Sequence, residues 1–175
     1  MSKNVKKYVV TALTLGVIAA GSAALIGLSN FITKERIAAN ATKKIELGLV
    51  EIYGNDATFS EAIDIDDGDY LDCYYTANKE EELLGYAFKV TGSNMYGQIS
   101  MLVGINTEFD IGKIYLIVNE QTYAQTLVDE FVTPYNNGDK KMNDQDVRCG
   151  ATFGGKLIKA MAEEAQSWAS ANLKG

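Results

Sequence analysis

Residues 83–122 read LLGYAFKVTGSNMYGQISMLVGINTEFDIGKIYLIVNEQT, and this stretch decides the fold. Its three apolar runs, 83–92, 97–106 and 113–122, are rich in β-branched and aromatic residues and are bounded by Gly or Asn. Such runs, separated by short polar turns, are typical of strands joined by hairpins. The stretch therefore predicts a meander of antiparallel strands from about Leu83 to Asn119.

Helical patterns flank these strands. Apolar residues recur at near-helical spacing in residues 34–54, which predicts a helix ending near Gly54. The segment 122–138 predicts a short helix ended by Pro134 and an Asn-Asn-Gly turn, because the residue before a proline avoids the helical region. A last helix is predicted from Gly155 to about Leu173. The fold class that follows is α+β, with one compact domain that has an antiparallel sheet and flanking helices.

The N-terminus carries an uncharged apolar run at residues 8–33, preceded by Lys3, Lys6 and Lys7. The run is long enough for a transmembrane helix. The lysines favour a cytoplasmic N-terminus and an extracytoplasmic C-terminal domain, which makes a single-pass protein of the cell membrane. A cleaved signal peptide is the alternative, with Gly21-Ser22-Ala23 as its site, although the apolar run continues past it. The predicted organisation is a cytoplasmic tail and anchor (1–33), a juxtamembrane helix (34–54) and a domain (55–175).

Charge and composition exclude several classes of function. The formal net charge is −7, and the basic residues cluster only at the N-terminus, so we expect no nucleic-acid partner. The chain has no histidine, which excludes Ser-His-Asp catalysis and imidazole-bound metals. Residues 55–76 are acidic and irregular; a calcium loop that begins at Asp64 is one interpretation, but its glycine falls at position five and not six, and no glutamate closes it at position twelve. The pattern favours a solvated acidic turn and no metal site.

Gly150-Ala151-Thr152 precedes the last helix and allows two interpretations. Glycine lets the backbone turn sharply, and the start of a helix favours an anion such as a phosphate, beside which Thr152 would supply a hydroxyl. Alternatively, Thr152 is only the N-cap of the helix. Composition alone favours the N-cap.

The segment DVRCGAT, residues 146–152, resembles the flavinylation signature Asp-x-x-(Ser/Thr)-Gly-Ala-Thr, whose last threonine carries FMN through a phosphodiester. The chain as a whole is similar to the FMN-binding domain family typified by two membrane subunits. These are the G subunit of Rnf electron-transport complexes and the C subunit of sodium-translocating NADH:quinone reductases. The likeness follows the order of an N-terminal span, a TKERIA segment, a sheet region ending in LVGI, the signature and a final helix.

The resemblance implies covalent FMN on Thr152, attached by an FAD-dependent flavin transferase that reads Asp146. Cys149 stands where the signature prefers Ser or Thr. Glu120 and Thr122 correspond to a loop that lies against the flavin in the Rnf subunit. The implied cofactor-binding residues are Tyr96, Gly97, Glu120, Thr122, Asp146, Cys149, Gly150, Ala151 and Thr152, with no catalytic residue. Aromatic candidates to flank the flavin ring are Tyr86, Tyr96 and Tyr123.

The implied function is a membrane-anchored electron carrier, either a G-like subunit of an Rnf complex or a free-standing extracellular protein. Its partners would be other membrane electron-transport subunits or an extracellular acceptor, together with the flavin transferase. A noncovalent flavin or ligand-binding module and a cofactor-free interaction domain remain alternatives. The two cysteines, Cys73 and Cys149, leave a disulfide open.

Overall fold

The computed structural model describes residues 3–147 and 151–174, with side chains for all of these except 3–6 and 29–39. The chain divides into two compact units, Met1–Lys43 and Lys44–Gly175. Helix α1 (Lys3–Tyr53) makes up the described part of the first unit, and its last turns belong to the second.

The first unit contains a segment suited to a lipid bilayer. Lys7–Leu28 is helical, has a mean hydropathy of 2.2, and has none of its residues buried. A helix of this length and composition can cross the hydrocarbon core of a membrane. It lies within the region where the sequence predicts the anchor.

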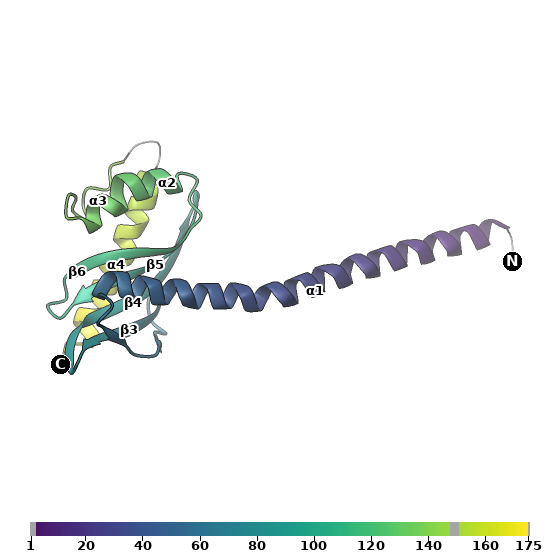
Figure 1. Ribbon diagram of the computed structural model, residues 1–175. Coiled ribbons are helices and arrows are strands. Elements are labelled where there is room, and N and C mark those ends of the chain that lie inside the picture. The colour runs from purple at the N-terminus through teal and green to yellow at the C-terminus, as the bar shows by residue number, and fades with distance from the viewer. Residues whose placement is uncertain (1–2, 148–150, 175) are drawn as a thin grey trace. The chain divides into compact units, whose positions relative to one another are not determined.

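The second unit is built on one antiparallel sheet of six strands (Figure 1). Strands β4, β5 and β6 form the predicted meander, so that prediction is confirmed. The spatial order is β1 (Thr58–Phe59), β3 (Leu71–Lys79), β4 (Glu82–Asn94), β5 (Gly97–Asn106) and β6 (Ile111–Asn119), and β2 (Ile63–Asp64) also pairs with β3.

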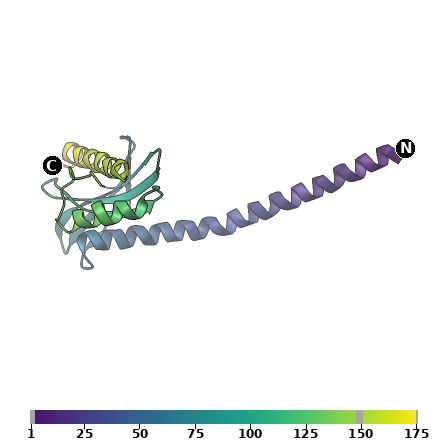
Figure 2. The same ribbon diagram turned by 90° about the horizontal axis from the view of Figure 1, so that it is seen from above.

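Helices cover both faces of the sheet, which confirms the α+β class. Figure 2 shows α4 (Thr152–Asn172) along one face. The core on that side includes Phe88, Met101 and Ile158, all fully buried. On the opposite face, Leu49 of α1 packs against Leu102. Successive residues of a strand point to opposite faces of the sheet. Apolar residues on the two faces therefore form two cores, one under α4 and one under the end of α1.

The Tyr53 hydroxyl fastens the end of α1 to the sheet. It donates to the Tyr86 carbonyl oxygen at 2.7 Å and lies 3.0 Å from the Ile105 carbonyl oxygen. The last turns of α1 are therefore part of the domain and not only a connection to it.

The helix after β6 runs further than the sequence predicts. It consists of α2 (Ala124–Leu127), a wider π-helical stretch η1 (Val128–Val132) and α3 (Thr133–Asn136). Pro134 was expected to end the helix, and this expectation is wrong. The proline lies in the first turn of α3, directly after the widened turn, where a missing N–H costs little.

Strand β3 corrects the interpretation of residues 55–76 as irregular throughout. Leu71, Cys73 and Ala77 are buried in it. Asp72, which suggested a solvated turn, pairs with Lys89 on β4 at 2.7 Å. Asp72 can lie within a strand because Lys89 on the neighbouring strand supplies a positive charge. The local sequence around Asp72 does not show this pairing.

Candidate functional site

Helix α4 begins at the last residue of the signature-like segment. Thr152 is its first residue, three positions before the predicted start at Gly155, and Ala151 occupies the N-cap position. Glycine disfavours helices, and Gly154 and Gly155 lie in the first turn of α4. In the structure they allow close packing: a Cβ on Gly154 would lie 2.7 Å from Leu127 Cδ2. Tight contact with the preceding helix therefore outweighs the local propensity.

The Thr152 hydroxyl is half-buried and bonds to the residues upstream. Its Oγ1 donates to the Val147 carbonyl oxygen at 2.9 Å, and the Val147 amide approaches the same oxygen at 3.3 Å. One carboxylate oxygen of Asp146 lies 3.4 Å away. The N-cap interpretation is wrong, because Ala151 holds that position and no side chain caps the helix there. The first and last residues of the segment 146–152 are thus neighbours in space.

Apart from the Asp146 carboxylate, the surroundings of Thr152 favour negative charge. The first turn of α4 contains no acidic residue, and this helix of 21 residues directs its positive end toward Thr152. Lys156 lies one turn further along, so its exposed side chain projects from the same side of the helix.

Two further groups of predicted residues meet at the end of the sheet where β4 turns into β5. The Thr122 amide donates to the Tyr96 carbonyl oxygen at 2.9 Å, and the Glu120 amide donates to that of Gln98 at 2.9 Å. Gly97 has φ +133°, and a Cβ there would overlap the Glu120 carbonyl oxygen. The close approach of the two segments therefore requires glycine at this turn.

This end of the sheet also touches the start of α4. The Asn94 side chain donates to the Phe153 carbonyl oxygen at 3.2 Å, and the Tyr96 and Phe153 rings lie 5.3 Å apart. The structure therefore brings most of the predicted site residues to one end of the domain: Tyr96, Gly97, Glu120, Thr122, Asp146, Ala151 and Thr152. Cys149 and Gly150 lie outside the described residues.

Sequence reasoning missed Asn94, Gln121 and Phe153. Buried Gln121 donates from its side chain to the Gly97 carbonyl oxygen and so links the two turns. The only local signal for Phe153 was its place directly after Thr152. Tyr86, by contrast, lies apart from Tyr96 and Tyr123: it stacks on Phe109 at 6.4 Å, toward the other end of β4.

Cys73 carries a free, buried thiol on β3. Its Sγ lies 3.8 Å from the Tyr75 hydroxyl, and burial raises the pKa of the thiol above its ordinary value. Cys149, the other cysteine of the possible disulfide, lies outside the described part of the chain.

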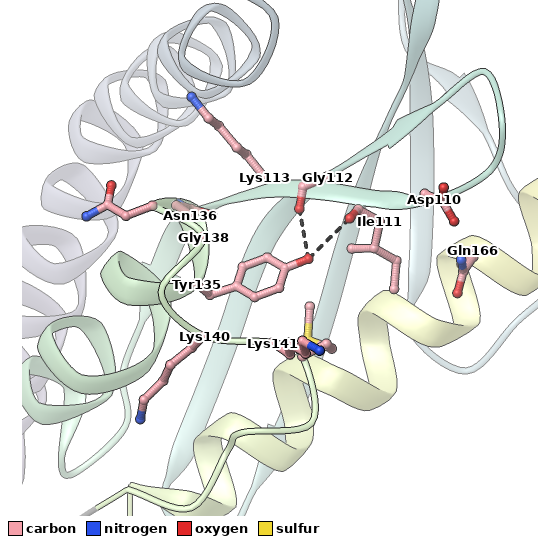
Figure 3. A pocket seen from close by; sticks show the side chains of 12 residues that line it. Asp110, Ile111, Gly112, Lys113, Tyr135, Asn136, Gly138, Lys140, Lys141 and Gln166 are labelled. Atoms are coloured by element: carbon pink, nitrogen blue, oxygen red, sulfur yellow. Dashed lines mark hydrogen bonds between the residues drawn. The ribbon is translucent and has the colours of Figure 1, made fainter.

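A pocket of about 640 Å³ lies away from this site, between the start of β6, the end of α3 and α4 (Figure 3). None of the predicted site residues lines it. Three lysines do, but Figure 3 shows Lys113 and Lys140 extending away from Tyr135 to opposite sides. Their ammonium groups do not converge on a common anion. Within residues 3–147 and 151–174, no three His, Cys, Asp or Glu side chains gather in a way that could hold a metal ion.

The chemistry of the site at Thr152 fits a tethered flavin phosphate. It offers a hydroxyl that is not fully buried, a helix end that favours anions and exposed aromatic rings beside them; these act against the repulsion of the Asp146 carboxylate, which lies 3.4 Å from the hydroxyl. These groups are suited to holding an aromatic anion, and the redox chemistry would come from the cofactor itself.

Comparison with known proteins adds information on the N-terminal part. Residues 1–52 match the family model described as the RnfG N-terminal region. A search of the curated proteins finds no match. The matched residues include Lys7–Leu28, which can span a bilayer, and the turns of α1 that pack on the sheet through Leu49. These findings fit a single-pass membrane protein with membrane electron-transport partners. The N-terminal part of the chain, residues 1–52, is therefore RnfG-like.

Proposed function

We propose that this subunit carries FMN covalently on Thr152, through a phosphodiester to the threonine hydroxyl, and passes electrons between membrane partners. The observation that carries the proposal is the arrangement of the segment 146–152. The Asp146 carboxylate lies 3.4 Å from Thr152 Oγ1, at the start of the longest helix of the domain. The flavinylation signature requires this aspartate and this threonine at this spacing.

The attachment reaction uses FAD and a flavin transferase. Thr152 Oγ1 forms a bond to the phosphorus on the flavin side of FAD, and the pyrophosphate bond of FAD breaks. AMP leaves, and the hydroxyl proton is lost to solvent. A threonine hydroxyl is a weak nucleophile, so the transferase must supply the activation.

Bound FMN would supply the electron-accepting and electron-donating chemistry. The protein's own part is to keep the cofactor at the end of the sheet and shield it. A covalent tether suits a domain outside the cytoplasm, where lost flavin could not be replaced from the cell's pool. We place the domain there, with electron-transport subunits of the same membrane as partners and an extracellular acceptor as the alternative.

Intact mass spectrometry of the full chain tests the proposal after co-expression with a flavin transferase, FAD and Mg²⁺. We expect the wild-type chain to be heavier by one FMN less one water. Thr152→Ser keeps a hydroxyl and should retain some adduct, whereas Thr152→Ala should have none. Loss of the Thr152 hydrogen bond should cost only about 0.5–1.5 kcal/mol of unfolding free energy, so the alanine variant should fold.

Thr133→Ala, at an exposed threonine on α3, is the matched control and should load like the wild type. Flavin fluorescence that stays with the denatured polypeptide would agree with a covalent link. Flavin that is released on denaturation would instead support noncovalent binding, and absence of flavin a cofactor-free domain. An adduct on the alanine variant would rule out Thr152 as the attachment point.

A further inference from the structure

Three aromatic rings from three separate segments meet beside Thr152. Tyr96, in the turn between β4 and β5, lies in the middle. Its ring is 6.3 Å from the ring of Tyr123, which precedes α2, and 5.3 Å from that of Phe153 in the first turn of α4. We call these three residues the aromatic platform.

The platform is unusually open for aromatic side chains. Tyr123 is 39 % exposed and Phe153 is 48 % exposed, and Met95, beside Tyr96, is 84 % exposed. Exposed apolar side chains that cluster on a folded domain indicate a binding surface for a ligand or a partner. The other aromatic groups of the domain, such as Tyr74, Phe88 and Trp168, pack within its main core.

Backbone contacts hold the platform in place. The Tyr96 amide donates to Asn94 Oδ1 at 2.8 Å, and the same Asn94 side chain donates through Nδ2 to the Phe153 carbonyl oxygen. The Thr122 amide donates to the Tyr96 carbonyl oxygen, which fixes the segment that carries Tyr123. A single asparagine thus joins the turn to the first turn of α4, and the rings are preorganised before any ligand arrives.

Lys156 lies over this surface. Its ammonium group is 5.9 Å from the centre of the Phe153 ring. Long side chains in a helix lean toward its N-terminus, so Lys156 leans back over the turn that contains Thr152. A phosphodiester on Thr152 would offer this ammonium a full negative charge in place of the weaker attraction of an aromatic ring.

We infer that the aromatic platform holds the isoalloxazine ring of the flavin, and that Lys156 pairs with the phosphodiester that tethers it. This inference rests on the proposed function, since it requires FMN on Thr152. The flat tricyclic ring lies against the exposed sides of Phe153 and Tyr123, with Tyr96 behind them. The three residues are positioning residues: they orient the ring and remove water from one of its faces.

Fluorescence of the loaded full chain in detergent tests the platform separately from attachment. Each sample is first shown by intact mass to carry one flavin. A ring held against tyrosine should emit weakly and with high anisotropy. In Phe153→Leu/Tyr123→Leu we expect emission to rise severalfold and anisotropy to fall toward that of a loosely tethered ring. Tyr123→Phe should raise emission while keeping high anisotropy, because the contact stays and the quenching phenol is gone.

Tyr86→Leu is the control, since it removes an aromatic ring near the other end of β4. It should leave emission and anisotropy unchanged. Lys156→Gln should load normally and make the anisotropy less sensitive to salt. A loaded double variant with unchanged emission and anisotropy would overturn the platform while Thr152 remains the attachment point. A wild-type chain with no added mass would overturn both.

Discussion

Tyr53, the last residue of α1, shows how much one side chain contributes to the domain. Its hydroxyl donates to the Tyr86 carbonyl oxygen and lies 3.0 Å from that of Ile105. Burial raises the pKa of Tyr53 above the ordinary tyrosine value of 10.0. The folded state therefore binds this proton more tightly than the unfolded state does. The resulting stability is fully present below pH 10 and is lost as the pH rises through the raised pKa.

We expect Tyr53→Phe to lower the unfolding free energy by about 1–3 kcal/mol at pH 7, because the Tyr86 carbonyl oxygen loses its hydroxyl donor. This difference from the wild type should shrink above pH 10, where the wild-type hydroxyl is itself penalised. Urea unfolding at several pH values, followed by Trp168 fluorescence, measures the difference. Tyr115→Phe, in the same small core, should lower the unfolding free energy at pH 7 by less than Tyr53→Phe does. A Tyr53→Phe difference that stays constant with pH would contradict the account.

Site residues can be predicted together from the sequence where they lie close to one another along the chain. Asp146 and Thr152 are six positions apart, and the resemblance of this short segment to the flavinylation signature implied that they act together. The contact between Asn94 and Phe153 joins residues 59 positions apart, and no local pattern announces it. For the same reason Tyr86 could not be separated from Tyr96 and Tyr123 before the strand register was known.

Among the elements, the edge strand β6 is closed by side chains and not by another strand. The Ile114 amide donates to Asn136 Oδ1 at 2.9 Å, and Asn136 Nδ2 donates to the Ile114 carbonyl oxygen at 2.7 Å. Tyr135 donates to the Gly112 carbonyl oxygen at 3.0 Å (Figure 3), and Lys44 donates to that of Ile117 at 2.9 Å. Unpaired edge groups invite pairing with other chains, and these contacts occupy several of them.

Asn136→Ala should therefore destabilise the domain by about 1–3 kcal/mol, since it leaves two backbone groups of Ile114 without their partner. It should also increase self-association, because part of the edge becomes free. Urea unfolding and size-exclusion chromatography in detergent measure the two effects. Asn137→Ala changes the exposed neighbouring residue and should do neither. Equal unfolding free energies and equal self-association of the two variants would show that the side-chain amide of Asn136 does not stabilise the edge strand.

Elements were predictable where their apolar pattern was strong and uninterrupted. The meander of β4 to β6 follows directly from alternating β-branched and aromatic residues. Strand β3 was missed because Asp72 depends on Lys89 of another strand. The helix through Pro134 and the start of α4 at Thr152 were missed because they depend on a widened turn and on close packing against Leu127.

For the whole molecule, the proposed orientation has the N-terminus in the cytoplasm and the domain outside. Three lysines lie at or before the start of the apolar helix, and positive charge favours the cytoplasmic side. Protease added to intact protoplasts should digest the domain and leave the anchor. A cytoplasmic marker protein should survive in the same sample. A domain that is digested only after the membrane is permeabilised would reverse the orientation.

The hydroxyl of Thr152 has a single proton, and in the structure that proton is directed at the Val147 carbonyl oxygen. An oxygen bonded to phosphorus has no proton to donate. Under the proposed function, flavin attachment and this hydrogen bond therefore exclude each other. Val147 is only 9 % exposed, so its carbonyl group would need a new donor or a new position. The transferase must therefore break this hydrogen bond before it can modify the hydroxyl, and the attached flavin then prevents the hydrogen bond from re-forming.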